Sequence, residues 1–249
     1  MKLLENKKAL VTGSSRGIGK KITEVFLANG AEVWGLCTKE SAGKAELEKL
    51  AADNGVAFHE IYADASNAEQ LKEVVTAALK EAGAFDVLVN NAGIAQQKLF
   101  TDITEAEWKR MTGINLDGVF YCSQQALKRY MLPSHQGVIV NISSMWGQVG
   151  ASCEVHYSAA KAGVIGLTKA LAKEVGLSNI RVNCIAPGVV MTDMMKDFDE
   201  ETVQALKEET PLNILGTPED IADAAVYLCS DKAKFITGQI LGINGGFII

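Results

Sequence analysis

Short apolar runs alternate with longer amphipathic stretches along the 249 residues of this chain. The apolar runs are continuous, which is typical of strands in a sheet that is covered on both faces. Strands that are separated by helices favour parallel βαβ units with right-handed crossovers. The pattern predicts strands over Ala9–Thr12, Glu32–Leu36, Ala57–Tyr62, Val87–Val89, Val138–Asn141, Arg181–Ile185 and Gln239–Ile243, and helices over Ile18–Asn29, Ala42–Asp53, Ala68–Glu81, Glu105–Met131, Tyr157–Val175 and Pro218–Leu228.

No linker rich in Pro, Gly or Ser divides the chain, and no internal repeat is found. We therefore expect residues 1–249 to form a single doubly wound α/β domain with a mostly or fully parallel sheet of about seven strands and helices on both faces. The segment Met191–Gly216 is irregular, with a short helical pattern at Glu200–Glu209. It is either a surface excursion or a mobile cover over a site, and its place after the carboxyl end of a strand favours the cover.

Charge and cysteine usage narrow the class of protein. The net charge is −6 and no dense block of Lys or Arg occurs, so neither nucleic acid nor an anionic membrane surface is expected as a partner. No apolar run approaches the roughly 20 residues that span a bilayer, and the amino terminus does not have the pattern of a signal peptide. The five cysteines are scattered and form no Cys-x-x-Cys pair, which indicates reduced thiols in a cytoplasmic protein.

A glycine-rich turn follows the first predicted strand. Ala9-Leu10-Val11 leads into Thr12-Gly13-Ser14-Ser15-Arg16-Gly17-Ile18-Gly19, within which a predicted helix begins. Glycines permit a tight turn and a close approach of the backbone to a ligand. The start of the helix then offers free N–H groups and the positive end of its dipole, and both favour a bound pyrophosphate.

Tyr157 and Lys161 are four residues apart in a predicted helix. Positions i and i+4 lie on the same helix face, so the phenol and the ammonium are expected side by side. A neighbouring cation favours the phenolate and lowers a tyrosine pKa from about 10 towards neutrality. Such a tyrosine can exchange a proton with a carbonyl or alcohol oxygen. His156 precedes it, but adjacent helix positions point in different directions, so His156 is not expected to act as a base.

The spacing Thr-Gly-x-x-x-Gly-x-Gly resembles the glycine motif of the short-chain dehydrogenase/reductase family. The likeness extends over essentially the whole chain, because the other motifs of the family occur in its order. It implies a Rossmann-type fold, a nicotinamide dinucleotide cofactor and oxidoreductase activity. The motifs are Asn90-Asn91-Ala92-Gly93, Asn115, Ser144, Tyr157 with Lys161, Pro187-Gly188 with Thr192, and Asn244-Gly245-Gly246.

The resemblance also implies how the cofactor is held. NAD-preferring Rossmann domains carry an acid at the tip of the second strand. Here that strand leads into Thr38 and Lys39, and Arg16 lies in the glycine turn, a combination that suits a 2′-phosphate and predicts NADP(H) rather than NAD(H). Asp64 matches the adenine contact of the family, with a turn residue as the alternative. The implied cofactor-binding residues are Gly13, Ser15, Arg16, Gly17, Ile18, Gly19, Thr38, Asp64, Ala65, Asn91, Ala92, Gly93, Tyr157, Lys161, Pro187, Gly188, Val190 and Thr192.

The same resemblance assigns the catalytic roles. Tyr157 is the general acid for carbonyl reduction, and Lys161 lowers its pKa and binds the nicotinamide ribose. Ser144 orients the substrate carbonyl, and Asn115 holds a water near Lys161. Ser143 is adjacent to Ser144, but the family gap of thirteen residues to the tyrosine favours Ser144. The three histidines lack metal-ligand spacing, so no catalytic metal is expected.

Within the family the chain is most similar to bacterial 3-oxoacyl-acyl-carrier-protein reductases, which implies a 3-oxoacyl thioester substrate and a homotetramer. Two departures are clear. The arginines that dock the carrier protein in that subgroup correspond to Ser134 and Ser178, and Glu154 replaces a glutamine near the tyrosine. The stretch 141–155 is also similar to reductases of an aminoketone on elongation factor P, so Glu154 is either a ligand for a substrate amine or a solvated acid.

Other readings remain open from the sequence. Met145 and Trp146 either line the substrate pocket or only pack in the interior. A steroid ketone is an alternative substrate. A non-enzymatic NADP(H) sensor is an alternative of a different class, although such proteins usually lose part of the catalytic set.

Overall fold

The computed structural model describes residues 2–195 and 198–249. Within them, parallel strands form one sheet of seven in the order β3-β2-β1-β4-β5-β6-β7, which confirms the predicted α/β fold. The order reverses between β1 and β4, and ligands of open α/β sheets bind in the crevice at such a switch point. The strands are β1 Lys8–Thr12, β2 Glu32–Cys37, β3 Phe58–Tyr62, β4 Val87–Asn90, β5 Gly137–Ile142, β6 Ile180–Pro187 and β7 Ile240–Ile243.

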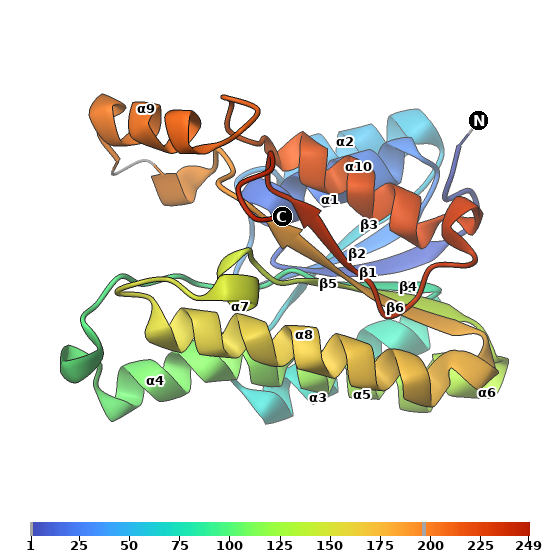
Figure 1. The fold of residues 1–249 in the computed structure, drawn as a ribbon. Helices are drawn as coiled ribbons and strands as arrows, with labels where there is room; N and C mark the ends of the chain where they lie inside the picture. Colours follow the sequence, from blue (N-terminus) through green and yellow to red (C-terminus); the bar gives the residue numbers. More distant parts are fainter. Residues whose placement is uncertain (1, 196–197) are drawn as a thin grey trace.

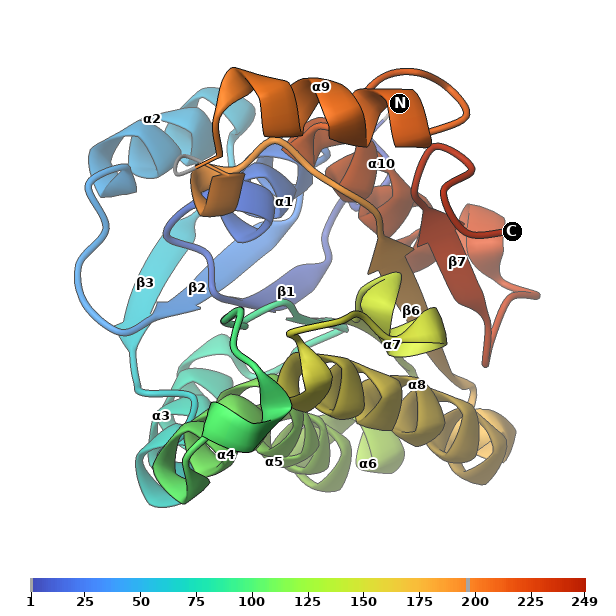
Figure 2. The same ribbon diagram turned by 60° about the vertical axis from the view of Figure 1, so that its left-hand side comes forward.

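Helices cover both faces of the sheet (Figure 1). One layer contains α1, α2 and α10, and the opposite layer contains α3, α4, α5, α6 and α8. Helix α9 projects from the first layer, and both views show it apart from the sheet (Figure 2). The helices are α1 Gly17–Ala28, α2 Lys44–Asn54, α3 Ala68–Ala82, α4 Glu105–Thr112, α5 Gly118–Ala126, α6 Leu132–Ser134, α7 Trp146–Val149, α8 Val155–Val175, α9 Glu200–Glu209 and α10 Pro218–Cys229.

The sheet separates two apolar cores. On one face, Phe26 of α1 and Ile221 of α10 pack against Val11 in the centre of the sheet, and all three are fully buried. On the other face, Leu10 and Leu88 pack against residues of α3, α5 and α8. Because neighbouring strand residues serve opposite cores, the strands need apolar side chains at consecutive positions. This requirement explains the continuous apolar runs in the sequence.

The predicted helix over Glu105–Met131 differs most from the structure. It is interrupted by two π-helical turns, Gly113–Asp117 and Leu127–Met131, and the chain remains helical as far as Ser134. Helix α8 begins at Val155, two residues before the predicted start at Tyr157. Helix α9 has the predicted bounds. Among the described residues, no helix is long and apolar enough to cross a membrane.

Candidate active site

The glycine turn packs directly against the segment that follows β4. Gly13 has a φ of +71°, and a Cβ there would lie 2.8 Å from the Cα of Ala92. Asn91 joins the two segments, since its Nδ2 donates to the carbonyl oxygens of Thr12 and Gly13 at 3.0 and 3.2 Å. The Thr12 hydroxyl accepts the N–H groups of Asn91 and Ala92 at 3.0 Å each. The sequence predicted a ligand role for Asn91, and the structure shows that its amide holds the turn in shape.

The start of α1 is open to an anion. Arg16 is the N-cap residue and makes no side-chain capping bond, and the first turn contains no acid. A Cβ at Gly19 would collide with the carbonyl oxygen of Gly13, so the helix begins tightly against the turn. Among the described residues, no acceptor side chain caps these N–H groups, which are free for a phosphate. The turn that contains Ser15, Gly17 and Ile18 therefore fits a dinucleotide.

A carboxylate from the neighbouring strand lies near the tip of β2, and the sequence pattern did not predict it. The strand ends at Cys37, and Thr38 and Lys39 follow it, both exposed. Glu60 comes from the neighbouring strand β3 and accepts the N–H and hydroxyl of Ser41, just beyond that tip. Burial, together with the Glu60 charge, raises the pKa of the Cys37 thiol to about 12. Glu60 thus lies near the expected ribose end of the site, although Ser41 and the Tyr62 hydroxyl occupy its oxygens.

Asp64 and Ala65 lie after β3, on the other side of the turn. The Asp64 carboxylate accepts the N–H and the hydroxyl of Ser66 at 2.8 and 2.7 Å, and these bonds lower its pKa. Asp64 is therefore a turn residue in this structure, and an adenine contact remains a prediction. The Ala65 carbonyl oxygen is 3.0 Å from where a Cβ of Gly118 would lie, so α5 approaches this loop closely.

The structure separates the roles of the two adjacent serines. Ser143 donates to the carbonyl oxygen of Lys161 at 2.8 Å and so ties the end of β5 to α8. Ser144 accepts the N–H of Trp146 at 3.1 Å, and its hydroxyl lies close enough to Tyr157 to lower the pKa of that phenol. Ser144 is therefore the serine beside Tyr157, and the adjacent serine has a structural partner.

Lys161 does not acidify Tyr157 in this structure, contrary to the expectation from their spacing. Its Nζ donates to the carbonyl oxygen of Ile142 at 2.9 Å and lies 5.7 Å from the centroid of the tyrosine ring. Burial lowers the pKa of Lys161 to about 8. Burial raises the pKa of Tyr157 to about 12, the charge of Glu154 adds to this, and the bond with Ser144 opposes it. The ammonium is bound to a backbone carbonyl rather than to the phenol, and this explains the difference.

Asn115 lies in the first π-helical turn and is fully buried. Its Nδ2 donates to the carbonyl oxygens of Ile94 and Met111, both at 3.0 Å, and its Oδ1 accepts the N–H of Ile94 at 3.2 Å. A Cβ at Gly93 would lie 2.7 Å from Asn115 Oδ1 and 3.4 Å from Lys161 Nζ. The segment after β4 therefore connects the glycine turn with Asn115 and Lys161, two of the catalytic candidates. π turns occur frequently at functional sites.

The chain after β6 approaches the glycine turn from the other side. A Cβ at Gly17 would lie 3.7 Å from the methyl group of Thr192. Gly188 donates its N–H to Ile243 and has no room for a Cβ, which would lie 2.7 Å from the Cα of Asn244. The structure therefore brings Thr192 to the phosphate end and seats Gly188 against the carboxy-terminal segment. The preceding Pro187 accepts the N–H of Met145 at 2.9 Å.

The three predicted substrate residues lie in different environments. Met145 is only 2% exposed, so it is an interior residue in this structure. Trp146 packs edge-to-face against Phe247 at a centroid distance of 5.8 Å. Glu154 is half-buried, and burial raises its pKa, which the nearby Gln97 side chain opposes. Of the three, Glu154 is the group whose charge reaches Tyr157.

The segment 191–216 leaves and rejoins the domain at one place. Val190 and Gly216 form an isolated parallel bridge, and Met191 donates its N–H to Gly216 at 2.8 Å. Helix α9 in this segment has no buried residue. In the part of the chain that is described, no three His, Cys, Asp or Glu side chains are grouped to hold a metal ion.

Comparison with known proteins assigns the chain to a family. A protein-family model described as "Enoyl-(Acyl carrier protein) reductase" matches residues 13–248. Proteins named 3-oxoacyl-[acyl-carrier-protein] reductase are similar over 98% of this chain and 98% of their own length, at 43% identity in Chlamydia muridarum and 42% in Vibrio cholerae.

A solved structure of a putative short-chain alcohol dehydrogenase from Sinorhizobium meliloti superposes with a TM-score of 0.92 at 39% identity and covers 98% of this chain and 97% of its own. A putative gluconate dehydrogenase from Agrobacterium tumefaciens gives the same TM-score at 32% identity over 98% and 96% of the two chains. Both likenesses extend across the whole fold. The chain therefore belongs to the short-chain dehydrogenase/reductase family of oxidoreductases.

Proposed function

We propose that this protein is an NADPH-dependent carbonyl reductase that converts 3-oxoacyl thioesters on acyl carrier protein into 3-hydroxyacyl thioesters. The observation that supports it most is the meeting of Ser144 and Tyr157 next to Lys161, which the segment Asn91–Gly93 connects to the glycine turn. The identity of 43% to a 3-oxoacyl-[acyl-carrier-protein] reductase supports the substrate. On this proposal residues 1–249 act as one NADP-binding domain, with 191–216 as its substrate cover.

The side chains have distinct tasks in this proposal. The bound cofactor supplies a hydride to the carbonyl carbon. Ser144 donates a hydrogen bond to the carbonyl oxygen and stabilises the negative charge that develops there. The Tyr157 hydroxyl gives its proton to that oxygen. Lys161 stabilises the resulting phenolate once its ammonium leaves the Ile142 carbonyl, and Asn115 fixes the loop at Ile94 and holds a water beside Lys161.

The cofactor preference depends on Arg16. We expect Arg16→Gln to weaken NADPH binding by roughly 10- to 100-fold, since a hydrogen bond to a charged group contributes about 1.5–3 kcal/mol. NADH binding should change little, because NADH lacks the 2′-phosphate. Fluorescence titration with both cofactors measures the two constants, and Arg129→Gln, an exposed arginine of the opposite layer, is the control. Equal weakening for both cofactors would show that Arg16 does not contact the 2′-phosphate.

The carrier protein needs a basic surface, because acyl carrier proteins are acidic. Ser134 lies at the end of α6 and donates to the Tyr130 carbonyl oxygen, and Ser178 is half-buried. Neither supplies charge at the docking positions of the subgroup. Lys128, Arg129 and Lys173 are all exposed, and we propose that they supply it instead.

A panel of ketones tests the proposed function. NADPH oxidation is followed with 3-oxoacyl thioesters on carrier protein and on coenzyme A, an aminoketone and a steroid ketone, and repeated with NADH. Fastest turnover of the carrier-bound thioester with NADPH is the expected result. Fastest turnover of another ketone would replace the substrate and keep the reaction. Tight NADPH binding without turnover of any ketone would overturn the reductase and favour an NADP(H) sensor.

One observation favours a second substrate class, an amine-bearing ketone such as the aminoketone on modified elongation factor P. Glu154 is half-buried, its charge raises the pKa of Tyr157, and it makes no ion pair within the described residues. We expect Glu154→Gln to raise KM for an amine-bearing ketone about 10-fold and to spare a neutral ketone, because a partly desolvated ion pair contributes roughly 1–2 kcal/mol. Steady-state kinetics with matched amine and hydroxyl ketones measure this, and equal effects on both would exclude the amine ligand.

We also propose that four copies assemble, as the resemblance implies. β7 is the edge strand of the sheet, and large apolar side chains are exposed beside it, with Phe235 99% and Ile249 fully exposed in the single chain. The carboxy-terminal residues are therefore not buried by their own domain. Apolar surface of this kind usually marks a contact between proteins. All five cysteines are free, which suits the cytoplasm as the place of action.

A further inference from the structure

The loop segment 96–98 and the segment 153–156, which immediately precedes Tyr157, run side by side in opposite directions. Gln96 bonds His156 at 3.2 Å, and the N–H of Lys98 donates to the Cys153 carbonyl oxygen at 2.7 Å, while Gln97 between them lies near Glu154 and opposes the rise in its pKa. We name residues 96–98 the strap. The strap lies in the loop after β4, and its partners lie just before and within the first turn of α8. The chain just before Tyr157 is thus tied to that loop at His156 and at Cys153.

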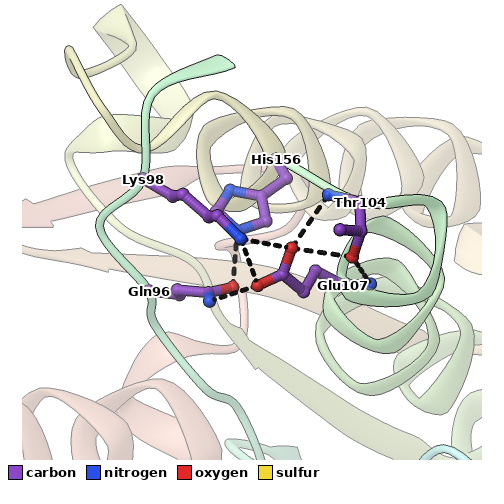
Figure 3. Close-up of polar contacts among 5 residues, drawn as sticks. All are labelled: Gln96, Lys98, Thr104, Glu107 and His156. Carbon is purple, nitrogen blue, oxygen red and sulfur yellow. Dashed lines mark hydrogen bonds and ion pairs between the residues drawn. The ribbon is translucent and has the colours of Figure 1, made fainter. Parts of the chain in front are cut away.

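The strap is itself anchored by Glu107 of α4 (Figure 3). The Glu107 carboxylate accepts the Lys98 ammonium at 2.7 and 2.8 Å and the amide nitrogen of Gln96 at 2.9 Å. It also accepts the N–H and hydroxyl of Thr104 and closes the capping box of α4. Glu107 therefore joins the strap to the first turn of α4.

Glu107 determines the orientation of the Gln96 amide. A carboxylate only accepts hydrogen bonds, so the Gln96 nitrogen faces Glu107 and its oxygen faces His156. His156 must then donate from Nε2, and its Nδ1 is left without a proton and without a partner in the described structure. His156 is fully buried. A buried polar atom without a partner lowers the free energy of unfolding. Packing alone therefore does not explain why a histidine occupies this position.

We infer that Gln96 and His156 are positioning residues that fix the Tyr157 hydroxyl for proton transfer by tying the first turn of α8 to the strap. His156 is adjacent to Tyr157, so its bond to Gln96 restrains the backbone of the helical turn that carries the phenol. The inference deepens the proposed function and rests on it. A misplacement of about 1 Å at a reacting group lowers the rate as much as 100-fold.

Substitutions at both ends of this hydrogen bond test the inference. Gln96→Met and His156→Leu remove the bond at similar volume, whereas His156→Gln keeps a donor near the position of Nε2. Gln136→Met is the matched control, because among the described residues the Gln136 side chain bonds only the Tyr130 hydroxyl, before the amino end of β5. Urea unfolding, NADPH titration and steady-state kinetics on the best ketone are measured for each variant and for the double variant Q96M/H156L.

We expect Gln96→Met and His156→Leu to lower kcat by roughly 10- to 100-fold with KM and NADPH affinity within about 3-fold of wild type. His156→Gln should recover most of the loss, and the double variant should be no slower than the slower single variant. Wild-type kcat in Gln96→Met would overturn the inference, and this surface-accessible change remains informative if His156→Leu fails to fold. Three other results would also overturn the inference: a change in KM without a change in kcat, no recovery of kcat in His156→Gln, or losses of kcat that multiply in the double variant. A wild-type protein that reduces no ketone would instead overturn the proposed function.

Discussion

Replacing Tyr157 with phenylalanine is expected to lower kcat by about 100- to 10,000-fold, the usual contribution of a general acid. The change removes one oxygen, which lies near Ser144, and leaves the ring in place. Cofactor affinity and the unfolding free energy should therefore change little. Ketone turnover at saturating NADPH, together with a fluorescence titration of NADPH, measures both effects.

The control is Tyr227→Phe, which removes the same oxygen from an exposed tyrosine on α10. Turnover of this variant should equal that of the wild type. If Tyr157→Phe kept undiminished turnover, another group would have to supply the proton, and the mechanism proposed above would be wrong at its central step.

Replacing Lys161 with methionine is expected to make the protein more stable and nearly inactive. Lys161 is 4% exposed, and burial lowers its pKa from 10.5 to about 8. Each unit of pKa shift corresponds to about 1.4 kcal/mol, so the charged form costs the folded state on the order of 3 kcal/mol at neutral pH. The bond to the Ile142 carbonyl is lost in the variant, so a net gain of about 1–3 kcal/mol is expected at pH 7.

The pH dependence has a definite sign. Between pH 8 and 10.5 the unfolded chain keeps a proton on Lys161 that the folded protein has released. Wild-type stability from this group therefore rises with pH across that window, and the advantage of Lys161→Met should disappear as the pH approaches 10.5.

Urea unfolding at pH 7 and at pH 9.5 measures this difference, with Lys169→Met on the exposed face of α8 as the control. Turnover of Lys161→Met should fall about 100-fold or more because the phenolate loses its cation. A variant that is less stable than wild type at pH 7 would show that the buried ammonium stabilises the fold instead.

The hydrophobic pattern predicted the fold because each strand feeds two cores. Leu10 and Val11 are both fully buried but face opposite layers, so adjacent apolar residues were an unambiguous signal. The π turn at Asn115 could not be predicted, since α and π turns place apolar residues at nearly the same spacing. The partners that settle this turn, Ile94 and Met111, become neighbours only in the folded chain.

The site was predictable where a motif is local and unpredictable where it depends on long-range contacts. The spacing placed Tyr157 and Lys161 on one helix face, but it did not contain the Ile142 carbonyl, which draws the ammonium away from the phenol. The place of Glu60 near the tip of β2 was not predicted, because Glu60 comes from the next strand. The strap was invisible because Gln96 and His156 are sixty residues apart in the chain.

The bridge between Val190 and Gly216 closes the base of the excursion after β6, where the two crossing backbone bonds measure 2.8 and 3.0 Å. The chain thus leaves and rejoins the domain at the same place, and closing a longer loop between these two residues costs little extra conformational entropy. Insertions, deletions or wholesale exchange of the chain between these two residues need not disturb the sheet. Duplicated copies can thereby diverge beyond Thr192, which stays against the glycine turn, in the molecules they accept while inheriting Ser144, Tyr157 and Lys161 unaltered.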